Sequence, residues 1–128
     1  MWIFTTKGFL SIVQHMDLPE HFQVKARVPS PIEELWPNYE IDVIDWADYR
    51  FRITISKDEV IPALVKEIES VLYTSFKNAC EADETYQHAL VNVWATMYNY
   101  QLRIEAMADQ NSLAGVTNDT MESPRSDE

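Results

Sequence analysis

Apolar and polar residues alternate along much of the first half of the chain, and this pattern predicts β-strands with one buried face. The alternation is strict over residues 22–28 and 49–55, and apolar runs occupy residues 2–5, 9–15 and 41–44. The first two apolar runs predict a hairpin, because Gly8 can take positive φ in the turn between them. The side chains that we expect to point into the core are Phe22, Val24, Ala26, Val28, Tyr49, Phe51, Ile53 and Ile55.

A short helix is predicted between these strands, from residue 30 to Pro37. Ser30 is expected to be its N-cap, Pro31 its first helical residue and Glu33 the third, which together form a capping box.

Helical spacing replaces the alternation in the second half of the chain. Ser56, with Asp58 as the rival cap, is expected to begin a helix. Its apolar face comprises Val60, Ile61, Leu64, Val65, Ile68, Val71 and Leu72. Asp83 or Thr85 is expected to begin a last helix, to about Glu105. Its apolar stripe comprises Tyr86, Ala89, Leu90, Val93, Trp94, Met97, Tyr98 and Ile104.

Strands followed by helices predict an α+β fold. We expect a two-layer sandwich in which an antiparallel or mixed sheet from the first half carries the helices of the second half on one face. Residues 1–105 are predicted to form a single domain. Residues 106–128 are acidic and have no aromatic residue and no periodic apolar face, so they are predicted to be a disordered tail.

The composition indicates a cytoplasmic protein. Cys80 is the sole cysteine of the 128 residues, so no intramolecular disulfide can form. No apolar run approaches the length of about 20 residues that a membrane helix needs, and the first residues lack the pattern of a signal peptide.

The net charge of −11 limits the classes of partner. Nucleic acids and anionic membranes repel an acidic chain, so we expect neither to bind directly. The acidity is expected to serve solubility. The alternative is an acidic surface that docks on a basic protein, such as a nucleic-acid-handling protein. The sequence is also compatible with a homo-oligomer.

Basic residues gather on the face of the sheet opposite the predicted core. Lys25 and Arg27 share that face on one strand and Arg50 and Arg52 on another, with Lys7 expected nearby. Such a cluster favours an anion, because the arginine fork matches phosphate and carboxylate groups. The alternative is that these cations keep an exposed face hydrated and pair with Asp42, Asp45 and Asp48.

Two further residues are candidates for ligand or partner contact. Trp46 is either an exposed anchor for a partner or a ring that closes the end of the core. Lys77 lies in the segment 73–78, which is either a ligand-binding loop or an ordinary connection between helices.

Catalytic, metal and cofactor signatures are missing from the sequence. His15, His21 and His88 do not stand at zinc-motif spacing, and Cys80 has no base nearby in the sequence. Gly8 and Gly115 are the sole glycines, so no phosphate-binding glycine loop can form. We therefore expect no catalytic residues, no metal and no cofactor, and the sequence favours a non-enzymatic protein over an enzyme.

Four spaced segments resemble a family of small bacterial and phage proteins of unknown function. They are residues 1–11 (MWIFTTKGFLS), 47–52 (ADYRFR), 73–77 (YTSFK) and 93–101 (VWATMYNYQ). The resemblance implies a bacterial or phage origin and carries no activity. Its motif residues in this chain are Thr5, Gly8, Asp48, Tyr49, Arg50, Arg52, Phe76 and Lys77.

Two hypotheses follow from the sequence. The leading one is a small acidic interaction protein, of phage origin if the resemblance holds, that binds or inhibits a macromolecular partner. The alternative is a domain that binds a small anion or a nucleotide on the face formed by Lys25, Arg27, Arg50 and Arg52, with Lys77 contributing.

Overall fold

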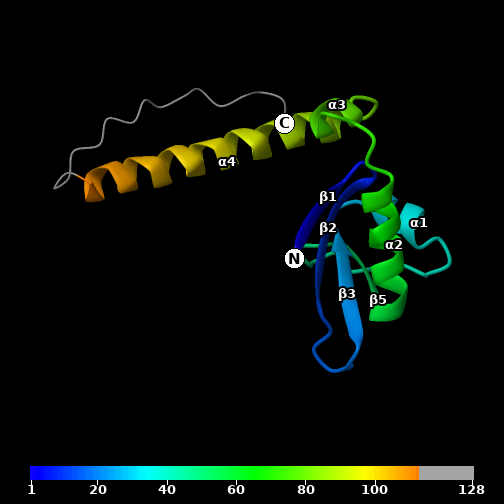
Figure 1. The fold of residues 1–128 in the computed structure, drawn as a ribbon. Helices are drawn as coiled ribbons and strands as arrows, with labels where there is room; N and C mark the ends of the chain where they lie inside the picture. The colour runs from blue at the N-terminus through cyan, green and yellow to red at the C-terminus, as the bar shows by residue number, and fades with distance from the viewer. Residues whose placement is uncertain (113–128) are drawn as a thin grey trace. The chain divides into compact units, whose positions relative to one another are not determined.

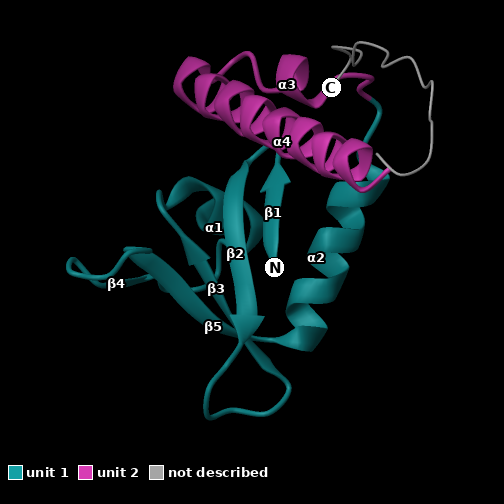
Figure 2. Ribbon diagram, turned by 90° about the vertical axis from the view of Figure 1, so that its left-hand side faces the viewer, with its two compact units in different colours: residues 1–72 teal, residues 73–128 magenta. Residues whose placement is uncertain are grey.

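The computed structural model describes residues 1–112. The chain divides into two compact units, Met1–Leu72 and Tyr73–Glu128, which Figure 2 shows in different colours. The first unit contains five strands and helices α1 and α2, and the second contains α3 and α4 (Figure 1).

The sheet of the first unit is antiparallel throughout, with the strand order β1-β2-β3-β5-β4. Its strands are β1 (Trp2–Thr5), β2 (Gly8–Gln14), β3 (His21–Ala26), β4 (Asp42–Val43) and β5 (Phe51–Ser56). This architecture confirms the predicted α+β class. In antiparallel pairing, side chains on facing positions point to the same side of the sheet, so each pair of strands shares two faces.

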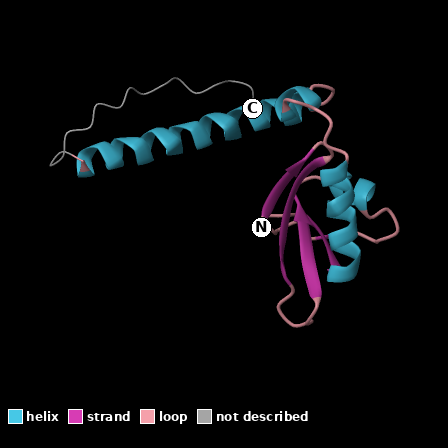
Figure 3. Cartoon of the chain, in the orientation of Figure 1, coloured by secondary structure: helices cyan, strands magenta, loops and turns pink. Residues whose placement is uncertain are grey.

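Helices α1 (Ser30–Leu35) and α2 (Lys57–Glu69) pack on one face of this sheet, as Figure 3 shows. The core between the layers comprises Leu10, Ile12, Val24, Ala26, Ile32, Trp36, Ile53, Ile55 and Val60. The indole N–H of Trp36 donates to the backbone oxygen of Glu59 at 3.1 Å, which ties the end of α1 to the start of α2. Each fully buried aliphatic side chain stabilises the unit by about 1.5–3 kcal/mol.

The predicted alternation is correct within the strands and wrong just outside them. Val24, Ala26, Ile53 and Ile55 are buried, and Phe22 and Phe51 pack against the core. Val28 follows the end of β3 and is 55% exposed. Tyr49 precedes β5, and its ring lies beside Phe9 on the opposite face. Both errors arise because these strands are shorter than the alternating runs.

Only one of the two serines predicted as N-caps begins a helix as expected. The N-cap of α1 is Pro29 and makes no side-chain cap, so Ser30 is the first helical residue and not the cap. At α2 the prediction is confirmed, because the hydroxyl of Ser56 accepts a hydrogen bond from the backbone N–H of Asp58 at 3.2 Å.

The second unit contains the short helix α3 (Phe76–Ala79), within the segment predicted as a connection, and the long helix α4 (Glu84–Asn111). Asp83 caps α4, as one of the two predicted alternatives had it, by accepting from the N–H of Tyr86 at 3.1 Å. The helix continues six residues past Glu105, so residues 106–111 are helical and not part of a disordered tail. The rest of the predicted tail, residues 113–128, lies outside the described residues.

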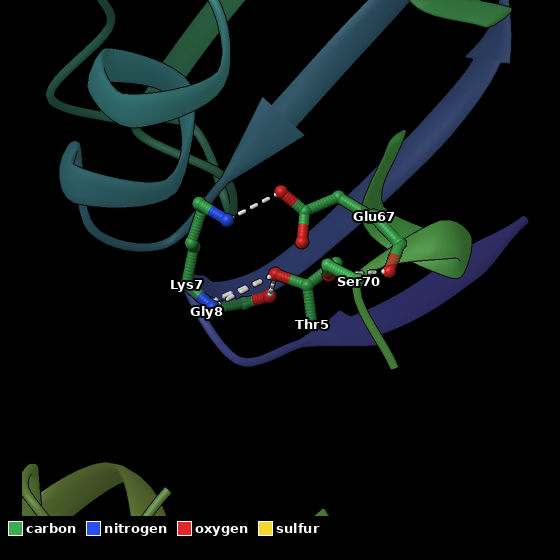
Figure 4. Close-up of polar contacts among 5 residues, drawn as sticks. All are labelled: Thr5, Lys7, Gly8, Glu67 and Ser70. Carbon is green, nitrogen blue, oxygen red and sulfur yellow. Dashed lines mark hydrogen bonds and ion pairs between the residues drawn. The ribbon is translucent and has the colours of Figure 1, made fainter. Parts of the chain in front are cut away.

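The turn between β1 and β2 depends on Gly8 and on the hydroxyl of Thr5. Gly8 has a φ of +140°, and a Cβ added there would lie 2.8 Å from Cγ of Pro31 in α1. Thr5 Oγ1 donates to the backbone oxygen of Gly8 at 3.0 Å and accepts from the N–H of Lys7 at 3.0 Å (Figure 4). The turn therefore combines a backbone angle that suits glycine with a contact that leaves no room for a side chain.

We predict that Gly8→Ala destabilises the first unit. The unfavourable φ alone costs about 1–3 kcal/mol, and the contact with Pro31 adds to it. Thermal denaturation followed by circular dichroism should show a melting temperature several degrees below that of the unchanged chain. Thr6→Ala is the control, because Thr6 is an exposed residue of the same turn. Equal melting temperatures for the two variants would contradict the role assigned to Gly8.

Candidate functional site

The face of the sheet opposite α1 and α2, here named the outer face, carries most of the candidate residues. The strand registers align Trp2 with Ser11, Ser11 with Lys25, and Lys25 with Arg52. On the far side of Arg52, the short strand β4 contributes Asp42. These five residues form one row across the sheet, with the two cations side by side near its middle.

An aromatic cluster lies on the outer face beside this row. The rings of Phe4 and Phe9 stack with their centroids 4.6 Å apart, and Trp2 meets Phe9 edge to face at 6.0 Å. Tyr49 completes the cluster, with its centroid 6.3 Å from that of Phe9. The sequence did not predict this cluster of four rings. The signal for three of them was present, because Trp2 and Phe4 are two residues apart on β1, and Phe9 pairs with Phe4 across the turn.

Two of the predicted cations are neutralised by aspartates. Arg27 donates from Nη1 to a carboxylate oxygen of Asp48 at 3.0 Å, and Arg50 donates from Nη2 to Asp45 at 2.6 Å. The hydrogen bond that Arg27 donates to the Asp48 carboxylate raises the pKa of Arg27. Its guanidinium also lies 4.4 Å from the centroid of the Tyr49 ring. The alternative in which these cations pair with nearby aspartates is therefore correct for Arg27 and Arg50.

Lys25 and Arg52, unlike Arg27 and Arg50, are not neutralised by a carboxylate among the described residues. Within residues 1–112, neither has a carboxylate within ion-pair distance. Arg52 donates from Nη2 to the backbone oxygen of Tyr49 at 3.0 Å, while its Nε is buried without a hydrogen-bond partner among the described residues. Like charges on directly opposite strand positions destabilise a sheet. Asp42 lies opposite Arg52 on β4 but forms no ion pair with it, so ion pairing does not explain why these two cations lie side by side.

The other predicted site residues lie elsewhere. Lys7 forms an ion pair with Glu67 of α2, as Figure 4 shows, so it points to the helical side of the sheet and does not join the cations of the outer face. Trp46 is 89% exposed and does not close the core. Lys77 belongs to the second unit, where its ammonium group lies 4.6 Å from the centroid of the Trp94 ring.

Apolar side chains also remain exposed on α2. Only Val60, Ala63 and Leu64 of this helix face the core. Five residues that were predicted to share the buried face are exposed, Ile68 by 70% and Leu72 by 92%. Ile61, Val65 and Ile68 belong to α2, whereas Val71 and Leu72 lie past its end at Glu69. The sequence could not separate the two faces because both are apolar.

Helix α4 carries a second exposed apolar stripe. Helix α3 covers only its first turns: the side chain of Gln87 donates to the backbone oxygen of Lys77 at 2.9 Å, and Leu90 is buried. From Val93 onward, exposed apolar residues recur at spacings of four and three. They are Val93, Met97, Tyr100, Ile104 and Met107, between 36% and 58% exposed, and are named here the α4 stripe.

The described residues offer little to acid–base or nucleophilic chemistry. Burial raises the pKa of the Cys80 thiol and of the Tyr86 hydroxyl, so both groups stay protonated near neutral pH. In residues 1–112, no three His, Cys, Asp or Glu side chains are grouped to hold a metal ion. No helix in this part of the chain is both long and apolar enough to cross a membrane.

Comparisons of the chain with family models, with curated proteins and with solved structures find no significant match. The resemblance to a family of small bacterial and phage proteins therefore stays a prediction.

We predict that Cys80 reacts slowly in the folded chain. Because its thiol is buried and its pKa is raised, the thiolate fraction at pH 7.5 is lower than in an unfolded chain. Alkylation by iodoacetamide, followed by mass spectrometry, should be at least about tenfold slower for the native chain than for the chain in urea. Similar rates in the two conditions would show that Cys80 is accessible and reactive.

Proposed function

We propose that this chain is a non-enzymatic interaction protein that binds a protein partner through the α4 stripe. The observation that carries the proposal is the set of five apolar side chains, exposed at alternating spacings of four and three along one helix. This spacing places them on one face of the helix, as in helices that pack against a partner. Exposed apolar rows of this kind mark interaction surfaces.

The charges along α4 also support a protein partner. No Asp, Glu, Lys or Arg occurs between Glu84 and Arg103, although the whole chain carries a net charge of −11. An interface centre without charges avoids the cost of desolvating them, as in many protein interfaces. Glu105 and Asp109 follow toward the end of the helix. The proposed partner therefore has an apolar centre and a basic rim, a charge pattern that nucleic-acid-handling proteins can supply.

The acidic side chains of α2 are less favourable to an interface built on acidity alone. Glu67 is only 13% exposed and is held by Lys7, so it cannot contact a partner as a free carboxylate. The acidic residues of α2 that remain exposed, Asp58, Glu59 and Glu69, lie near the two ends of the helix. The apolar stripe of α4 is the more continuous surface.

We predict that Met97→Asp combined with Ile104→Asp abolishes partner binding. Losing two central apolar anchors costs about 2 kcal/mol each, or at least about a hundredfold in affinity. The measurement is co-purification with the tagged chain from its native cell, followed by titration of the recovered partner. Asn92→Asp with Asn99→Asp is the matched control, because it adds the same charge at exposed positions of α4 outside the stripe.

The proposal requires that the unchanged chain and the control retain one stoichiometric partner that the stripe variant loses. Retention of that partner by the stripe variant would contradict it. Sedimentation of the purified chain adds a second readout, since a dimer that the stripe variant converts to monomer would make the partner a second copy of this chain.

A further inference from the structure

Lys25 and Arg52 are adjacent cations with no carboxylate partner among the described residues. We propose that this pair and the neighbouring aromatic cluster form a binding site for a small molecule that carries a phosphate group and a flat ring, the chemistry of a nucleoside monophosphate. The site lies wholly within the first unit, so it does not depend on the function proposed for α4.

The phosphate end of the ligand is assigned to the row that contains the two cations. Lys25 and Arg52 face each other across β3 and β5, with their side chains on the same face. Lys25 supplies a compact ammonium group and Arg52 a planar guanidinium, which together suit the oxygens of one phosphate. Gln23 and Thr54, paired in the next row of the same face, add polar side chains beside the cations.

The unpaired Nε of Arg52 is stronger evidence for a bound anion than the positive charge of its side chain. Its Nε is buried and has no partner within residues 1–112, while its Nη2 donates to the backbone oxygen of Tyr49. Buried polar groups of folded proteins are nearly always paired, so an unpaired guanidinium nitrogen calls for a partner. Because this Nε is buried, a phosphate oxygen pairs with its N–H only after the Arg52 side chain turns outward, and the same phosphate would offset the repulsion between the two cations.

The ring end of the ligand is assigned to the aromatic cluster. Phe9 is the diagonal neighbour of Lys25, because Ser11, two residues along β2, is its direct partner. Diagonal neighbours in a sheet lie about 7–8 Å apart, a separation that a ribose can bridge. Trp2 is 70% exposed and meets Phe9 edge to face at 6.0 Å, so a flat ring can stack on this end of the cluster.

The surrounding charges favour a small ligand over a nucleic-acid strand. Asp42 stands directly beside Arg52 in the same row and would repel the next phosphate of a strand that crossed the sheet. Asp45 and Asp48 add carboxylates at the adjacent loop, and the whole chain carries −11. Long-range repulsion grows with the charge of the ligand, so a single phosphate group is tolerated better than a polyanion.

The first experiment compares three probes on the unchanged full-length chain by titration calorimetry at low salt. The probes are adenosine monophosphate, adenosine and inorganic phosphate. The expected result is that adenosine monophosphate binds at least about tenfold more tightly than either of the other two, and that its binding weakens as salt rises. Because no residue is changed, this comparison does not depend on the folding of any variant.

The second experiment measures adenosine monophosphate binding to variants. Lys25→Gln with Arg52→Gln should weaken the binding of adenosine monophosphate at least tenfold. Trp2→Leu should weaken the binding of adenosine monophosphate and leave the binding of inorganic phosphate unchanged. Lys57→Gln with Lys66→Gln is the control, because it removes the same total charge from helix α2. The control should bind as the unchanged chain does.

Three results would overturn the proposal. The first is the absence of binding of adenosine monophosphate at millimolar concentration. The second is equal weakening of binding by the double variants at Lys25 and Arg52 and at Lys57 and Lys66, which would show that only the net charge of the chain matters. The third is equal affinity for phosphate and adenosine monophosphate, which would remove the role of the aromatic cluster.

Discussion

The antiparallel register between β3 and β5 determines both faces of the first unit. It aligns Val24 with Ile53 and, one position along, Lys25 with Arg52. Since successive side chains of a strand point to opposite faces, the register that buries the first pair must place the second pair side by side on the outer face. Burying each aliphatic side chain contributes about 1.5–3 kcal/mol, whereas facing like charges cost roughly 0.2–1 kcal/mol. The core therefore holds the two cations together despite their repulsion.

The four cations of the outer face fall into two pairs, one neutralised by aspartates and one without an ion pair among the described residues. Arg27 and Arg50 reach aspartates of the loop that precedes β5, and such exposed ion pairs contribute little to stability. Lys25 and Arg52 lie within the strands, beyond reach of those aspartates, and one nitrogen of Arg52 is buried and unpaired among the described residues. A face with one neutralised pair and one free pair is suited to a local anion and not to a long polyanion.

Local patterns predicted the elements of this fold better than the surfaces. The alternation identified Val24 and Ile53 as core residues because it depends only on neighbours within one strand. It misplaced Tyr49 because the start of β5 is determined by the preceding loop. The aromatic cluster and the pairing of Lys7 with Glu67 depend on contacts between distant segments, which a local pattern does not contain. On α4 the periodicity was correct, but it could not show that α3 covers only the first turns, so the exposed stripe emerged from the structure.

The most direct test of this account follows the side-chain Nε–H signals of the arginines by nuclear magnetic resonance while adenosine monophosphate is added to the full-length chain. The account predicts that the signal of Arg52 moves in a saturable manner, because its buried nitrogen gains a phosphate partner. The signals of Arg27 and Arg50 should change little, because aspartates already hold their guanidinium groups. A saturable shift confined to Arg27 and Arg50, with Arg52 unchanged, would contradict the assignment of the free pair as the binding site.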